Sequence, residues 1–160
     1  MGSILTLPVS ARRRTALGFA IVLVCLVAFA GNVQAQDAPT RTFGSEAGLI
    51  LNPIKPEATA DFEMVMGRLK DALAKSEDPR RQEQAAGWKV FKSQEPGPGG
   101  SVLYVMVMDP AVPGGEYAVS KILSEAYPTE VQELYQKFSD AYAGGQSLLN
   151  LDMVSAFGAP

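Results

Sequence analysis

Two stretches of this 160-residue chain repeat the same spacing of apolar side chains, and this repeat constrains the fold more than any other feature. Successive members lie 3, 1, 3 and 4 residues apart, which places them along one face of an α-helix. A helix with one apolar face must bury it against another layer of structure. The two sets are Phe62, Val65, Met66, Leu69 and Leu73, and Val131, Leu134, Tyr135, Phe138 and Tyr142.

The boundaries of these two helices also follow from the sequence. Pro56 and Pro128 stand where the helical regions begin, a position at which proline is tolerated, and Gly144 with Gly145 ends the second helix. Gly67 interrupts the first stripe, either as a destabilising flaw or to allow close approach to a sheet.

Four segments have the patterns of β-strands: 47–52, 84–93, 102–108 and 147–154. The first ends at Pro53, and the third is apolar on both faces, which predicts a central position in a sheet. In the fourth we expect Leu149, Leu151 and Met153 to face the core. The remaining segments are a polar connection over 76–83, a Pro/Gly-rich hairpin loop over 95–100, a loop over 109–116 and a short helix over 117–127.

The order β-α-β-β-α-β predicts an α+β domain over 45–155 with a ferredoxin-like, split-βαβ arrangement. Two main helices would cover one face of a four-stranded antiparallel sheet, and residues 156–160 would form a flexible tail. Trp88 or Phe91, Tyr104 and Leu151 indicate that the other face is not simply polar. Because a monomer rarely leaves a large apolar face open, we expect a second copy to cover it.

The first 35 residues have the layout of a signal peptide. Three arginines (12–14) precede an uncharged apolar run over 16–30, and Val33-Gln34-Ala35 resembles a cleavage site. The run is shorter than the roughly 20 residues of a membrane-spanning helix, which favours cleavage over the alternative of an uncleaved anchor. We therefore predict a signal peptide over 1–35, a linker over 36–44, and a periplasmic or secreted domain without a stable membrane anchor.

Cleavage at this site would remove much of the chemistry available to the chain. The sequence has no histidine, and Cys25, its only cysteine, lies inside the predicted signal. Removing the three arginines from 14 basic residues leaves 11 against 17 acidic residues, a net charge of −6, which argues against nucleic-acid binding. Triads that need histidine or cysteine, and metal or haem sites that need imidazole or thiolate, are excluded. We expect no metal, no cofactor and no catalytic residue.

The predicted layout resembles the dimeric α/β-barrel superfamily. The resemblance rests on Gly87-Trp88-Lys89-Val90-Phe91 in the second strand and on the short helix before the second long one. It implies two sheets packed face to face. Members that degrade haem hold the iron by a histidine, which this chain lacks, whereas the cofactor-free antibiotic-biosynthesis monooxygenases use tryptophan, asparagine and tyrosine around an aromatic substrate. Trp88, Asn52 and Tyr104 are residues of those types.

Together these features predict a non-catalytic, homodimeric binding or interaction module that takes a small apolar ligand. The candidate ligand-binding residues are Trp88, Tyr104, Asn52 and Tyr117. One alternative is a cofactor-independent, monooxygenase-like enzyme that acts on an aromatic or quinone-like substrate lined by the same residues. Another is an inhibitor or assembly factor that binds proteins through 109–127. Arg80 and Arg81 could clamp an anion, although solvated charges explain them more simply.

Overall fold

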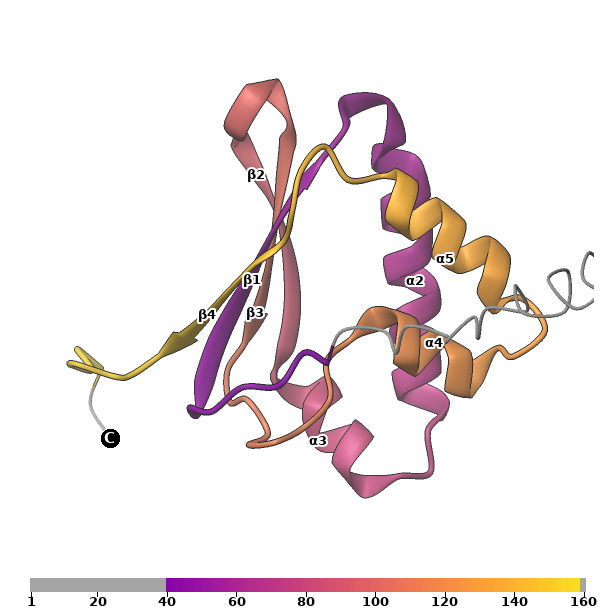
Figure 1. Ribbon diagram of the computed structural model, residues 1–160. Helices are drawn as coiled ribbons and strands as arrows, with labels where there is room; N and C mark the ends of the chain where they lie inside the picture. The colour runs from indigo at the N-terminus through magenta and orange to yellow at the C-terminus, as the bar shows by residue number, and fades with distance from the viewer. Residues whose placement is uncertain (1–39, 159–160) are drawn as a thin grey trace, which may run out of the picture. The chain divides into compact units, whose positions relative to one another are not determined.

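The chain folds into an α+β structure in which helices cover one face of a four-stranded antiparallel sheet (Figure 1). A computed structural model describes residues 40–158, so the predicted signal peptide and the first residues of the predicted linker lie outside the described part. The strand order is β2-β3-β1-β4. The strands are β1 (Ala47–Ile54), β2 (Trp88–Pro96), β3 (Val102–Met108) and β4 (Ser147–Leu151).

The helices connect these strands. The two main helices are α2 (Thr59–Lys75) and α5 (Val131–Asp140). The shorter helices are α3 (Pro79–Gly87) and α4 (Val119–Ala126). Two short 3-10 turns are η1 (Pro56–Ala58), directly before α2, and η2 (Pro98–Gly100). The predicted α+β class and antiparallel sheet are confirmed. The architecture is compatible with a ferredoxin-like type of fold, but the order of its elements does not match the predicted one fully: α4 is the short helix expected over 117–127, whereas α3 was not expected. No helix within residues 40–158 is long and apolar enough for a membrane span.

The core lies between the sheet and the helices α2, α4 and α5. Helix α2 buries most of its predicted stripe, whereas α5 buries Leu134 and Phe138 but leaves Tyr135 51 % exposed, and it ends before Tyr142. Strands β1 and β3 contribute every second side chain. Within these strands and helices, large and fully buried side chains include Ile50 and Ile54 of β1, Phe62 of α2, and Met106 and Met108 of β3. The two long helices and the central strand β3 were therefore predicted correctly.

Helix α3 replaces what the sequence indicated as a polar connection and the start of a strand. Asp78 caps it, because its carboxylate accepts a hydrogen bond from the backbone N–H of Arg80 at 2.9 Å, and Pro79 occupies the first turn. At its other end, a Cβ on Gly87 would lie 2.0 Å from the carbonyl oxygen of Pro110. Gly87 thus lets the helix end directly against the loop that follows β3, and β2 starts only at Trp88.

Strand β1 passes through Pro53, where the sequence predicted an end. The carbonyl of Pro53 accepts a hydrogen bond from Ala143 N, on the side of β1 away from β3. A strand residue directs its nitrogen and its carbonyl to the same side, and β4 pairs with β1 only as far as Leu51. Proline therefore costs the sheet no hydrogen bond at this position.

The folded unit begins before Ser45, because Phe43 is 2 % exposed and belongs to the core. Its ring packs edge-on against Tyr117 with 5.2 Å between centroids, and it lies over Gly48 of β1. A Cβ on Gly48 would come within 2.2 Å of the Phe43 ring. Gly67, in contrast, has open space where its Cβ would be, so it does not serve close approach to the sheet.

These two glycines provide a paired test of the packing. Gly48→Ala should lower the free energy of unfolding by about 1–3 kcal/mol, because the Phe43 ring must move. Gly67→Ala should raise it by about 0.5–1 kcal/mol, because alanine is the better helix former and meets no obstacle. Urea denaturation measures both. In a Phe43→Ala background the cost of Gly48→Ala should shrink, and an unchanged cost would contradict the proposed contact.

Candidate functional site

The face of the sheet that the helices do not cover is largely apolar, and we call it the open sheet face. The register aligns its side chains in rows across all four strands. One row is Phe91, Val105, Leu51 and Ser147, and the next is Lys89, Val107, Leu49 and Leu149. Phe91 is 53 % exposed. Apart from Lys89, no member of these two rows carries a charge.

Strand β4 turns its more apolar side chains toward this open face. Leu148 is the β4 leucine that packs against the core, whereas Leu149 is 43 % and Leu151 37 % exposed. The expectation that Leu149 and Leu151 face the core is therefore wrong. Their partners in the register are Leu49 and Ala47 of β1, which lie on the same open face. Beyond the strand, Met153 is also exposed.

The two edges of the sheet differ in charge. Lys89 and Lys92 stand on β2, and charged side chains of this kind protect an edge strand from pairing with other chains. Residues 147–151 of β4 carry no charge. The apolar character of the open face thus extends to an edge strand without charge protection.

A second candidate feature is a groove bounded by α2, α3 and β2, which we call the Trp88 groove. It has a volume of about 530 Å³, and most of its lining is aliphatic. The residues that line it are Met66, Gly67, Leu69, Lys70, Leu73, Ala74, Ala85, Trp88 and Val90. The indole N–H of Trp88 is buried and has no acceptor among the described residues, although buried tryptophans usually find one. Lys70 provides the one charge in the lining.

The four predicted ligand-binding residues all lie on the helix side of the sheet, but they form two pairs. Trp88 and Tyr117 pack edge to face with 5.2 Å between ring centroids, while Asn52 and Tyr104 are neighbours across β1 and β3. Along β3, Trp88 is level with Met108, four residues from Tyr104. That spacing corresponds to about 13 Å along a strand. Trp88 lines the groove, whereas the side chains of Asn52 and Tyr104 are buried.

The amide of Asn52 has all of its hydrogen-bonding capacity filled within the protein. Its nitrogen donates to the carbonyls of Ile50 and Tyr104 at 3.0 and 3.2 Å. Its oxygen accepts from the hydroxyl of Tyr142 at 2.9 Å and from the amide of Gln146 at 2.8 Å. Burial raises the pKa of the Tyr142 phenol, and the contacts with Gln146 and the charge of Arg41 oppose that rise. Asn52 thus joins the sheet to the segment that follows α5.

The hydroxyl of Tyr104 is engaged at the surface end of its side chain. It donates to Glu63 of α2 at 2.5 Å, and Lys92 of β2 donates to the same carboxylate oxygen at 3.0 Å. The hydrogen bonds from Tyr104 and then from Lys92 lower the pKa of Glu63. The pKa of Tyr104 is raised, first by burial and then by its bond to this carboxylate. These contacts fasten α2 to the sheet.

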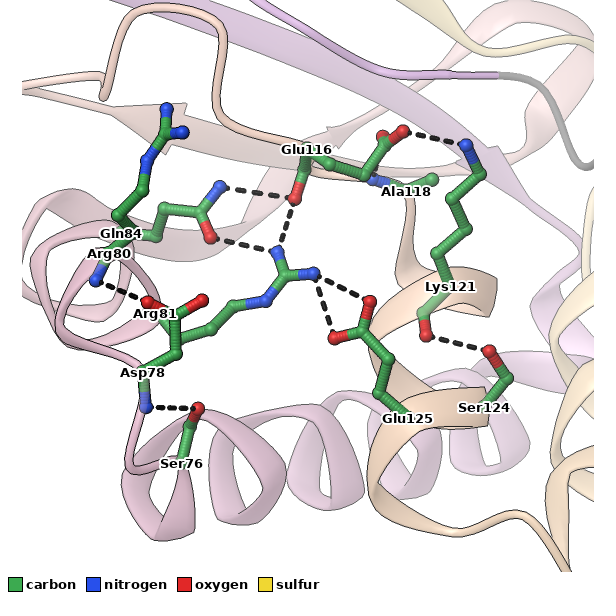
Figure 2. A network of polar contacts seen from close by, with 10 residues as sticks. All are labelled: Ser76, Asp78, Arg80, Arg81, Gln84, Glu116, Ala118, Lys121, Ser124 and Glu125. Carbon is green, nitrogen blue, oxygen red and sulfur yellow. Dashed lines mark hydrogen bonds and ion pairs between the residues drawn. The ribbon is translucent and has the colours of Figure 1, made fainter.

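Figure 2 shows the network that surrounds Arg81, one of the two arginines that could have clamped an anion. Its guanidinium donates to both carboxylate oxygens of Glu125 at 3.0 and 2.8 Å, to Gln84, and to the carbonyl of Glu116. These protein partners occupy the guanidinium. Arg80 is exposed and donates to the carbonyl of Pro113 at 3.2 Å. The network therefore joins α3, the loop before α4, and α4 itself.

Glu116 completes this network from the loop before α4. Burial opposes its ionisation, but the N–H groups of Arg41 and Ala118, together with the ammonium of Lys121, hold its pKa below the ordinary value. Both of its carboxylate oxygens are occupied by these donors. Among the described residues, histidine, cysteine, aspartate and glutamate form no cluster of three that could hold a metal ion.

The role of Asn52 can be tested by its removal. Asn52→Ala should lower the free energy of unfolding by about 2–4 kcal/mol, because the buried donors of Tyr142 and Gln146 lose their common acceptor. Gln136→Ala, which removes an exposed amide that donates to Asp140, should change it by less than about 0.5 kcal/mol. Urea denaturation compares the two variants. Equal, small effects would contradict the assigned role.

Comparison with known proteins does not assign a function to these features. No model of a known protein family matches the chain, and no curated protein matches it significantly. The open sheet face and the Trp88 groove are the two surface features described above that could bind a partner or a ligand.

Proposed function

We propose that this protein is an exported, non-catalytic binding module that works as a homodimer, with the open sheet faces of two copies packed together. The observation that carries the proposal is the orientation of β4. A strand at the edge of a monomer would be expected to turn Leu149 and Leu151 inward and to leave Asn150 outside. Here the leucines lie on the open face, where only a further layer of structure can bury them.

The composition of the central strands supports a second copy as that layer. Strands β1 and β3 present leucine and valine at successive positions of the open face, as strands buried on both sides do. Symmetric homodimers are the commonest assemblies of soluble proteins, and they require only a face that fits a copy of itself. The row that contains Val105 and Leu51 carries no charge, and Lys89 at the β2 edge is the one charge of the next row. The finer assignment to a ferredoxin-like fold that pairs into a dimeric barrel is part of this proposal.

The Trp88 groove is the site where we propose that the ligand binds. Its aliphatic lining suits a small apolar ligand, and its volume lies within the range of about 300–1,000 Å³ of ligand sites. Trp88, whose buried indole N–H has no acceptor among the described residues, is part of this lining. No observation favours the monooxygenase-like alternative, because the residues it would use lie in two separate pairs.

The dimer is tested by placing a charge on the open face. Phe91→Glu should raise the dimer dissociation constant about 100-fold or more, because dimerisation would have to remove a carboxylate from water. Met64→Glu on α2 is a matched control, since Met64 is a similarly exposed apolar residue in the helix layer, and it should leave the constant unchanged. Sedimentation equilibrium measures both. A wild-type protein that sediments as a monomer at about 100 μM would overturn the proposal, since stable dimers bind more tightly.

The groove is tested with the neutral apolar probe N-phenyl-1-naphthylamine. Trp88 is the only tryptophan, so saturable quenching of protein fluorescence reports a probe bound near it. Gly67→Leu should abolish this quenching by filling the groove, whereas Gly67→Ala should preserve it. Equal quenching in both variants, or none in the wild type, would contradict ligand binding in the groove.

A further inference from the structure

A separate pocket lies at the other end of the helix layer, between the starts of α4 and β4, and we call it the Arg41 pocket. Its volume is about 270 Å³. One part of the wall is apolar and is formed by Ile50, Met106, Val119 and Phe138. The other part is polar and includes Arg41, Tyr142 and Gln146. A mostly apolar cavity with a few converging polar groups is the usual form of a small-molecule site.

Arg41 lacks the partner that a sheltered arginine normally has. Its Nε–H is buried and finds no acceptor within residues 40–158. Its terminal nitrogens make two long contacts of 3.4 Å, to the carbonyl of Thr40 and to the amide oxygen of Gln146, and both acceptors are neutral. Among the described residues, no carboxylate forms an ion pair with it. Arginine presents several donors in a planar fork, which fits a carboxylate better than isolated neutral acceptors.

The surroundings leave this positive charge unbalanced. None of the residues that line the pocket is acidic. The nearest carboxylate along the network is that of Glu116, which accepts from the backbone N–H of Arg41 rather than from its guanidinium. Lys121 and the N–H of Ala118 occupy its remaining capacity. The first turn of α4 adds Val119 and Ser120 to the lining. All of these features favour an anion.

We propose that the Arg41 pocket binds a small carboxylate with an apolar body. The carboxylate would take the unpaired donors of Arg41 beside Gln146, and the apolar body would lie against Val119 and Phe138. This site differs from the Trp88 groove in place and in ligand charge. It also differs from the cluster of Arg81, whose guanidinium already has the carboxylate of Glu125 as its partner.

The test compares phenylacetate with its neutral analogue phenylacetamide, with ¹H–¹⁵N NMR of the arginine Nε–H groups as the readout. Phenylacetate should shift the Arg41 Nε–H resonance in a saturable manner and bind about 10-fold or more tightly than phenylacetamide, because only the anion forms charge-assisted hydrogen bonds. Arg41→Gln should remove this difference. Arg80→Gln, at an exposed arginine, should leave it unchanged.

A second variant keeps the test decisive if Arg41→Gln unfolds. Ser120→Phe should block the pocket without altering Arg41, and it should abolish binding while the backbone amide spectrum stays folded. Equal affinity for the acid and the amide in the wild-type protein would overturn the proposal. Shifts confined to Arg80 or Arg68 would do the same, since they would indicate surface binding only.

Discussion

The structure depends on one constraint: its two central strands are apolar on both faces, but its helices cover only one. Strands β1 and β3 place Ile50 and Met106 under the helices and Leu49 and Val107 on the opposite side. The hydrophobic effect stabilises the first set within the chain. The second set gains the same stabilisation only from another layer, and the outward leucines of β4 extend that requirement to the edge of the sheet.

The helix layer is held in place by polar contacts at its two ends. At one end Asn52 joins β1 to the segment after α5, and at the other Arg81 joins α3 to α4. In both clusters the hydrogen-bond donors and acceptors satisfy one another. Asn52 and Arg81 therefore hold the elements together and have few hydrogen-bonding groups left for a ligand. The two buried donors that remain unpaired among the described residues, on Trp88 and Arg41, each belong to a residue that lines a pocket. This contrast separates structural polar groups from candidate binding groups.

The sequence predicts those parts of the fold that depend on local periodicity. The stripes of α2 and α5 and the apolar run of β3 identify their elements because a regular spacing has one geometric interpretation. Helix α3 was not predicted, because Asp78-Pro79 is the only strong helix signal in its sequence. Its stability comes from contacts of Gln84 and Arg81 with residues distant in the sequence. The orientation of β4 was not predicted correctly either. Its alternate residues form two sets, one on each face of the strand, and both sets contain leucine.

The candidate sites are less predictable than the fold. Trp88 was identified by residue type and lines a groove, but its separation from Tyr104 depends on the register of three strands. Arg41 was assigned to a linker, and nothing in its local sequence indicates that it lies beside Gln146, 105 residues away. Pockets between distant segments exist only after the chain folds, so single-sequence patterns do not show them.

The most direct test of the central claim is a search for contacts between copies in a mixed sample. One copy would carry ¹³C-labelled leucine and valine methyl groups, the other would be unlabelled, and isotope-filtered NOE spectra would detect only contacts between them. We predict intermolecular NOEs at the methyl groups of Leu51, Val105 and Leu149, and none at those of Leu69 in α2. Intermolecular NOEs at the helix layer, or none at the open sheet face, would contradict the account.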